Sequence, residues 1–208
     1  TAIEKKEKGW KIKFSTCSKT FTILAKIVVD ATELGDIAAQ LGVAYDIGMD
    51  SRKTHGENIA PIKENEIIQD LTYVMILEDY AKDMTIEKPK GYDPEVFYCA
   101  SENDNCKMGE KINRTLCPKD SLLSYGRLPN GKVMINWPIN GNDYYVNVIE
   151  LSEEERNKSF EIAKLKSLQF LYYMQTELGF KTYSLAEDEF PTYDGFPLIP
   201  YHRESRRI

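Results

Sequence analysis

The stretch Leu168-Gln169-Phe170-Leu171-Tyr172-Tyr173-Met174 is apolar or aromatic at all but one position. It continues a pattern of apolar residues at helical spacing that begins near Phe160. Ahead of this pattern, Ser152 and Glu155 have the spacing of a capping box, and Gly179 after it is typical of a helix end. We therefore predict one long helix from the capping box to Gly179, with its second half buried against a sheet.

Strands are predicted on the N-terminal side of this helix. Residues 71–77 are almost continuously apolar, which is typical of a buried strand. Residues 132–137 and 143–149 also have strand character, and the Asn140-Gly141 pair between them is a strong turn signal. The pattern predicts a hairpin and an α+β fold, in which a mixed or antiparallel sheet packs with one long helix.

The first 44 residues have a pattern of their own. Residues 10–14 alternate between apolar side chains and lysine, which predicts a half-buried strand in a hairpin with residues 2–6. Residues 21–29 are predicted to pair back, and the β-branched end at 27–29 favours a strand covered on both faces. A short helix is expected over 36–41.

Composition limits the classes of partner. The chain has 208 residues, 42% of them hydrophobic, which suits a globular protein. Its formal net charge of −6 is unfavourable for binding nucleic acid, since phosphate contacts need a basic face. No apolar run approaches the roughly 20 residues that span a bilayer. We therefore expect a small-molecule partner and neither a nucleic-acid nor a membrane partner.

The four cysteines do not have the spacing of a zinc site, and no metal is expected. Three of them, Cys99, Cys106 and Cys117, fall in or near a region from 82 to 120 with little periodicity, which indicates a long insertion. Free thiols are the favoured interpretation. The alternative is a Cys99–Cys106 disulfide, which would indicate an exported protein. The sequence leaves the compartment open.

Residues 30–36, Asp-Ala-Thr-Glu-Leu-Gly-Asp, follow the apolar segment 27–29. Small residues at the end of a strand let a ligand approach the backbone, and a following helix offers unbonded N–H groups. This pattern suits a nucleotide site. The alternative is a plain strand-to-helix turn in which Asp36 is the N-cap.

Residues 136–145 combine aromatic and amide side chains on one loop. An aromatic face with amide hydrogen bonds is typical of sugar sites. The alternative is a hairpin turn with core aromatics. The candidate substrate-binding residues are Trp137, Asn140, Asn142 and Tyr144.

The last residues hold the candidate catalytic pair. His202 is one of two histidines, and imidazole is the usual proton-transfer group near neutral pH. Arg203 could bind a carboxylate or stabilise negative charge. In the alternative, Arg203 and Arg206 are structural and pair with Glu204 or with the acidic run 187–189. A glycosidase site in that run is disfavoured, because adjacent carboxylates rarely face each other.

These three segments resemble the FAD-dependent oxidoreductase family, which includes xanthan-lyase-like members of the glutathione-reductase-like flavoprotein class. The resemblance implies that Ala31, Thr32, Gly35 and Asp36 lie against FAD, although Glu33 stands where glycine is usual. It relates 137–143 to a Trp-Pro-x-x-Gly-Asn-Asp pattern in the substrate-side domain. It also places His202 and Arg203 near the flavin, on an arginine-rich return into the FAD domain.

The resemblance further implies a domain division and an activity. Residues 1–44 would form a partial edge of an FAD-binding domain, and residues 45–208 a substrate-side domain. The full-length enzyme would transfer hydride to flavin from a substrate that the resemblance does not identify, and the aromatic and amide-rich loop at 136–145 favours a carbohydrate-related one. No Gly-x-Gly-x-x-Gly fingerprint occurs, so we expect an internal piece of a flavoenzyme that is inactive alone and binds FAD poorly or not at all. The alternative function is a non-catalytic carbohydrate-binding or interaction domain.

Overall fold

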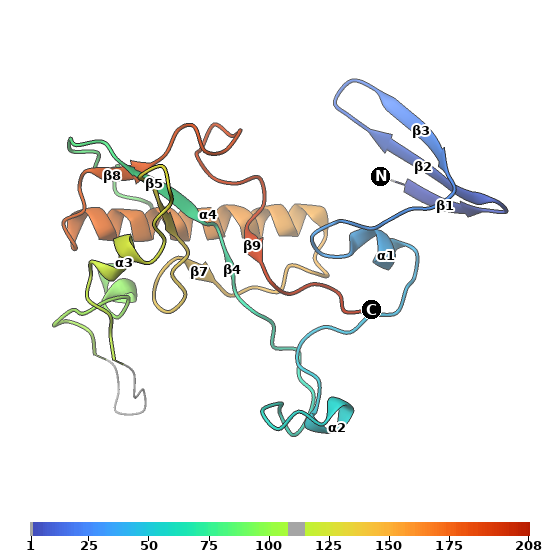
Figure 1. Cartoon of the computed structure of the whole chain (residues 1–208), viewed down its shortest axis with the longest axis horizontal. Coiled ribbons are helices and arrows are strands. Elements are labelled where there is room, and N and C mark those ends of the chain that lie inside the picture. The colour runs from blue at the N-terminus through green and yellow to red at the C-terminus, as the bar shows by residue number, and fades with distance from the viewer. Residues whose placement is uncertain (1, 108–114) are drawn as a thin grey trace. The chain divides into compact units, whose positions relative to one another are not determined.

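The computed structural model describes residues 2–107 and 115–208 (Figure 1). The chain divides into two compact units, one made of Thr1–Gln69 with Glu204–Ile208 and the other of Asp70–Arg203. We call them unit 1 and unit 2. The boundary at residue 70 is geometric, so the division into an FAD-domain edge and a substrate-side domain stays a prediction.

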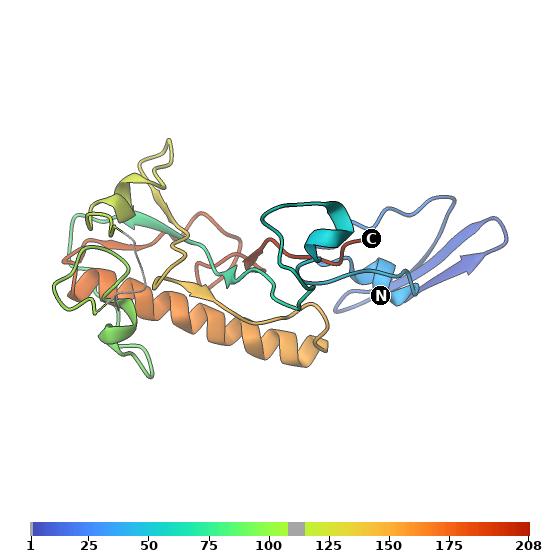
Figure 2. The same cartoon turned by 90° about the horizontal axis from the view of Figure 1, so that it is seen from below.

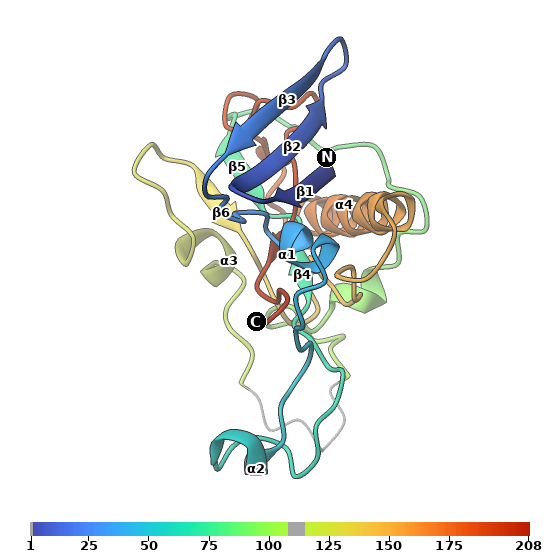
Figure 3. The same cartoon turned by 90° about the vertical axis from the view of Figure 1, so that its right-hand side faces the viewer.

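A three-stranded antiparallel sheet opens unit 1 (Figure 3). Its strands are β1 (Ala2–Lys6), β2 (Gly9–Ser15) and β3 (Thr20–Ala25), in the order β1-β2-β3. The register aligns Ile12 with an isoleucine on each neighbouring strand. Apolar side chains therefore gather on one face, and the predicted hairpin of 2–6 with 10–14 is confirmed.

The predicted extension of β3 to residue 29 is wrong. The strand ends at Ala25, and the side chains of Ile27 and Val29 are 79% and 81% exposed. No strand among the described residues pairs with 27–29. A β-branched segment without a neighbouring strand lacks the ladder hydrogen bonds and the packing that stabilise the extended form.

The rest of unit 1 is mostly loop. Helix α1 (Asp36–Gln40) buries Ala38, as the predicted helix over 36–41 requires, and α2 (Arg52–His55) is a single turn. The terminal segment joins this unit through an antiparallel bridge between Asp46 and Arg207. Its placement depends on a contact between residues 161 positions apart in sequence, which local patterns do not encode.

Unit 2 holds two small antiparallel sheets. The first has the order β7-β4-β9, and the second β6-β5-β8. Their strands are β4 (Leu71–Thr72), β5 (Met75–Asp79), β6 (Val133–Ile135), β7 (Asp143–Tyr144), β8 (Tyr183–Leu185) and β9 (Tyr201–His202). The predicted strand 71–77 is thus divided between two sheets.

The predicted hairpin of 132–137 with 143–149 is wrong. Strand β6 pairs with β5, whereas β7 pairs with β4. The buried amide of Asn142 explains the difference, since it accepts from the Trp137 amide and donates to the carbonyls of Tyr73 and Ile135. These bonds hold a turn that sends the two strands into different sheets.

Helix α4 (Glu153–Thr176) runs along unit 2 (Figure 2). The capping box of Ser152 and Glu155 is present, and the C-terminal half buries Phe170, Leu171 and Met174. Ser167 donates a hydrogen bond of 2.8 Å to the carbonyl of Tyr73, which ties the helix to the chain between β4 and β5. The α+β class with one long helix is confirmed.

The predicted insertion over 82–120 contains the short helix η1 (Pro94–Phe97), and α3 (Ser121–Ser124) follows directly after it. Residues 108–114 of the predicted insertion lie outside the described residues. Phe97 anchors it by packing against Phe170 of α4, with ring centroids 5.5 Å apart. Cys99 and Cys106 form a disulfide, so the free-thiol interpretation is wrong for these two, while Cys17 and Cys117 are free. Across residues 2–107 and 115–208, no helix is both long and apolar enough to cross a membrane.

Candidate functional site

A pocket of about 410 Å³ lies in unit 2 beside the loop that joins β6 to β7. Its charged side chains come from three elements: Asp70 just before β4, Asp143 at the start of β7, and Lys166 on α4. The uncharged part of the lining comes from η1 and the loop: Val96, Pro138, Ile139 and Gly141 are apolar, and Asn140 is polar.

Strand pairing fixes the position of Asp143. Its cross-strand partner on β4 is Thr72, whose hydroxyl donates a hydrogen bond to the Asp143 carboxylate. Burial raises the pKa of Asp143, the bond from Thr72 lowers it, and the negative charge of Asp70 raises it, so that the pKa is above the ordinary 3.8. Two carboxyl groups thus line the pocket and interact electrostatically, and Asp143 holds a proton more tightly than usual.

Lys166 supplies the positive charge of the pocket. Its Nζ lies 4.2 Å from the centroid of the Phe97 ring, a distance that allows a cation–π interaction. Burial is the one influence that shifts the pKa of Lys166, and it lowers that pKa. The half-buried ammonium thus stands against an aromatic face, with no acidic group shifting its pKa.

The four predicted substrate-binding residues occupy different surroundings. Asn140 lines the pocket and donates to the Val96 carbonyl at 3.3 Å. Trp137 donates its indole N–H to the Ala100 carbonyl at 2.8 Å, and the Asn142 amide is fully buried in the turn described above. Tyr144 is half-buried on β7. Contact between any of the four and a substrate stays a prediction.

The predicted catalytic residues lie at the end of unit 2. His202 is 6% exposed on β9, where its backbone is opposite Leu71. Arg203 is exposed, and its Nε donates to the Tyr201 hydroxyl at 2.9 Å. In the described part of the chain Arg203 forms no ion pair with the acidic run, whose Asp188 and Glu189 bind the buried Lys132. Arg206 does have the structural role of the alternative, but its partner is Asp36.

In unit 1, Asp30 organises the predicted cofactor segment. One oxygen of its carboxylate accepts from the amide and the hydroxyl of Thr32, and the other accepts from the Ala38 amide at 2.8 Å. Burial raises the pKa of Asp30, but these bonds outweigh it and the pKa is lowered. The alternative N-cap role of Asp36 is wrong, since Asp30 binds the α1 amide and the Asp36 carboxylate pairs with Arg206 at 2.9 Å.

Ala31 and Gly35 complete the cofactor segment. Ala31 is exposed, and Gly35 precedes α1 with φ of 70°, a conformation that favours glycine. The amide of Asp36 donates to the Thr32 hydroxyl at 2.7 Å. Ala31, Thr32, Gly35 and Asp36 are thus neighbours in one turn, whose amides at Thr32, Asp36 and Ala38 are bonded internally.

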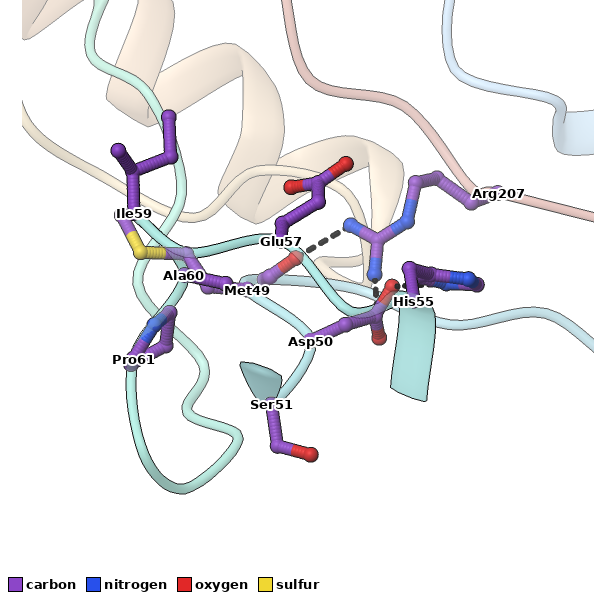
Figure 4. Close-up of a pocket in the computed structure, with 10 residues that line it drawn as sticks. Met49, Asp50, Ser51, His55, Glu57, Ile59, Ala60, Pro61 and Arg207 are labelled. Carbon is purple, nitrogen blue, oxygen red and sulfur yellow. Dashed lines mark hydrogen bonds and ion pairs between the residues drawn. The ribbon is translucent and has the colours of Figure 1, made fainter. Parts of the chain in front are cut away.

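A second cavity, of about 370 Å³, lies in unit 1 around α2 (Figure 4). Arg207 reaches into it and binds the Asp50 carboxylate at 3.1 Å and the Gly48 carbonyl. His55 lies next to Asp50, with its Nε2 3.2 Å from the second carboxylate oxygen (Figure 4). These bonds fasten the terminal segment to the 46–50 loop, and they give Arg207 a structural role.

A family model described as FAD dependent oxidoreductase matches residues 1–208. The chain belongs to the FAD dependent oxidoreductase family. No curated protein and no solved structure matches it. Membership makes flavin redox chemistry the general activity, with FAD as the cofactor of the full-length enzyme.

The turn at 30–38 lacks the features that hold the diphosphate of FAD. A dinucleotide diphosphate needs unbonded backbone amides at a helix N-terminus and glycines that let it approach. In this oxidoreductase the Asp30 carboxylate accepts a hydrogen bond from the Ala38 amide, and the Thr32 hydroxyl accepts one from the Asp36 amide. The sequence also lacks the glycine fingerprint. These residues do not fit the diphosphate, and their arrangement supports no catalytic step through the flavin.

The pocket residues carry weak sequence signals. Asp70 stands beside a predicted strand, where polar groups can line a pocket but core residues are the more usual case. Lys166 precedes Phe170 by four positions and Tyr173 by seven, so it shares their helix face. A lysine on the apolar face of a buried helix is the signal that could have found this site.

Proposed function

We propose that the protein is an FAD-dependent oxidoreductase whose unit 2 pocket binds a polyhydroxyl substrate of the carbohydrate class. The observation that carries the proposal is that Asp70, Asp143 and Asn140 line this one pocket. Carboxylate and amide oxygens accept hydrogen bonds from hydroxyl groups, and the apolar lining suits a carbon skeleton. Oxidation of a hydroxyl-bearing carbon by hydride transfer is chemistry that FAD supplies when bound.

The roles of the remaining predicted residues belong to the same proposal. His202 and Arg203 are proposed to act near the flavin, and residues 31–36 to lie beside a part of FAD other than its diphosphate. Support for the first comes from the pairing of β9 with β4, the strand that follows Asp70. Support for the second is the family membership alone.

Anaerobic reduction of the full-length enzyme loaded with FAD tests the proposal, since the 208-residue chain alone is expected to bind FAD poorly or not at all. Sugars and sugar alcohols are added, and bleaching of the flavin absorbance is followed. The Asp143→Asn variant should need about tenfold more substrate to reach half of its maximal rate of flavin reduction, because it loses one charge-assisted hydrogen bond to the substrate. Asp188→Asn is the matched control, because Asp188 binds Lys132 outside the pocket.

Two results would contradict this function. One is a flavin that no polyhydroxyl compound reduces. The other is an equal response of the Asp143 and Asp188 variants, which would move the substrate site away from the pocket. Glycan binding without any flavin reduction would instead favour the alternative, a non-catalytic carbohydrate-binding domain.

A further inference from the structure

Three lysines among the described residues are not exposed: Lys132, Lys164 and Lys166. Two of them are neutralised by carboxylates. Lys132 binds Asp188 and Glu189, and Lys164 binds Asp194 at 2.7 Å and lies 3.7 Å from Glu161. Lys166 instead lines the pocket, and no ion pair between it and a carboxylate is found in residues 2–107 and 115–208.

An ammonium group that is half-buried without a counterion costs free energy. The Phe97 ring offsets part of this cost, since it lies 4.2 Å from the Lys166 Nζ. The pocket also contains Asp70 and Asp143, yet neither forms an ion pair with Lys166 in the described part of the chain. The ammonium group and the two carboxyl groups therefore line one cavity without an ion pair between them in the described part of the chain.

We propose that the substrate of this pocket is a hydroxylated carboxylic acid, whose carboxylate binds Lys166 and whose hydroxyl groups bind Asp70 and Asp143. The assignment rests on the proposed substrate-binding role of the pocket and adds the chemical class. A neutral polyol would satisfy the carboxyl groups and leave Lys166 without a counterion. A ligand whose anionic group lay against Asp70 and Asp143 instead would be repelled by their carboxyl groups.

The Asp143 side of the pocket favours hydroxyl donors in a second way. Thr72 already donates to one oxygen of Asp143, which fixes the carboxyl group before a ligand arrives. A preorganised acceptor loses less conformational entropy on binding. Val96 and Pro138 also line the pocket and offer apolar surface to the carbon chain of a ligand.

Calorimetric titration of the protein with gluconate and with glucitol tests the assignment. The two probes have the same carbon chain, and gluconate replaces one terminal alcohol by a carboxylate. Gluconate should bind at least about tenfold more tightly at low ionic strength, and added salt should reduce the difference. Lys166→Met should remove the preference, because methionine still packs on Phe97 but carries no charge.

Two further variants separate charge recognition from structure. Lys166→Arg should keep most of the preference for gluconate. Lys158→Met should behave as wild type, because Lys158 is exposed on the same helix and pairs with Glu154. Equal binding of the two probes, no binding of either, or a preference that survives Lys166→Met would overturn the assignment.

The binding measurement needs no flavin, so it is independent of the proposed redox function. The protein could prefer gluconate in a way that depends on Lys166, while no hydroxy compound reduces its flavin. This result would support the ligand class and contradict the oxidoreductase role of the pocket. Flavin reduction by neutral polyols without any preference for gluconate would support the oxidoreductase role and contradict the assignment of a carboxylic acid as the ligand.

Discussion

At the scale of single residues, the buried amide of Asn142 holds the turn between β6 and β7. Asn142→Ala removes one acceptor and two donated bonds, leaving the Trp137 amide and two carbonyls without these partners. We expect a loss of about 3 kcal/mol in the free energy of unfolding, measured by urea denaturation. Asn140→Gly is the control, since Asn140 is exposed and its φ of 58° suits glycine. A similar loss in both variants would contradict the role of the buried amide.

Asp143 should make stability depend on pH. The pKa of Asp143 is raised in the folded protein, so folding favours the protonated carboxyl group. The contribution of this group to the free energy of unfolding is present at low pH and is lost as the pH rises through the folded pKa. Asp143→Asn cannot ionise. At neutral pH the variant should be at least as stable as wild type, and its advantage should shrink as the pH falls towards the ordinary carboxyl pKa of 3.8.

Asp83 provides the control of opposite sign. Hydrogen bonds from Thr85 lower the pKa of Asp83, so its contribution to stability is present at neutral pH and lost on acidification. Asp83→Asn should therefore be the less stable protein at neutral pH and approach wild type in acid. Urea unfolding across the pH range measures both variants, and parallel curves would refute the two assignments.

At the scale of elements, local signals predict structure better than long-range ones. The capping box and Gly179 define α4 because they act within one helical turn. Strand character at 71–77 is also correct, but the division between two sheets depends on Asn142 and Ser167, which are remote in sequence. The role of Lys166 could not be predicted for a related reason, since only the packing of η1 on α4 turns it into part of a pocket.

The N-cap of α4 gives a prediction at this scale. The Ser152 hydroxyl accepts from the Glu155 amide at 3.3 Å, while the Glu155 carboxylate accepts from the Ser152 amide at 3.1 Å. Ser152→Ala should cost about 1 kcal/mol in the free energy of unfolding. Ser159→Ala, at a half-buried position of the same helix where the hydroxyl donates to the Glu155 carbonyl, should be neutral or slightly stabilising because alanine has the higher helix propensity. Thermal unfolding of both variants checks this, and equal shifts would argue against the cap.

At the scale of the whole molecule, the chain returns to unit 1 at its last residues. The Arg206 guanidinium donates to the Leu34 carbonyl and to Asp36, each at 2.9 Å, and lies 5.1 Å from the Tyr45 ring centroid. Composition indicates only that the last residues are basic. The resemblance to flavoproteins is what predicts that the chain returns to its N-terminal part at these residues. The partners of Arg206 could not be predicted, because Asp36 is 170 residues away in sequence.

Arg206→Ala should loosen unit 1 and leave unit 2 intact. The substitution removes a charge-assisted pair whose arginine side chain is 7% exposed, so we expect a local loss of about 2 kcal/mol. Hydrogen exchange should become faster at the α1 amides of Ala39 and Leu41, while the amides of α4 keep their protection. Arg203→Ala is the matched control, since Arg203 is exposed and its bond goes to Tyr201. Faster exchange in α4, or unchanged exchange in α1, would mean that the terminal arginine does not stabilise the unit to which the structure assigns it.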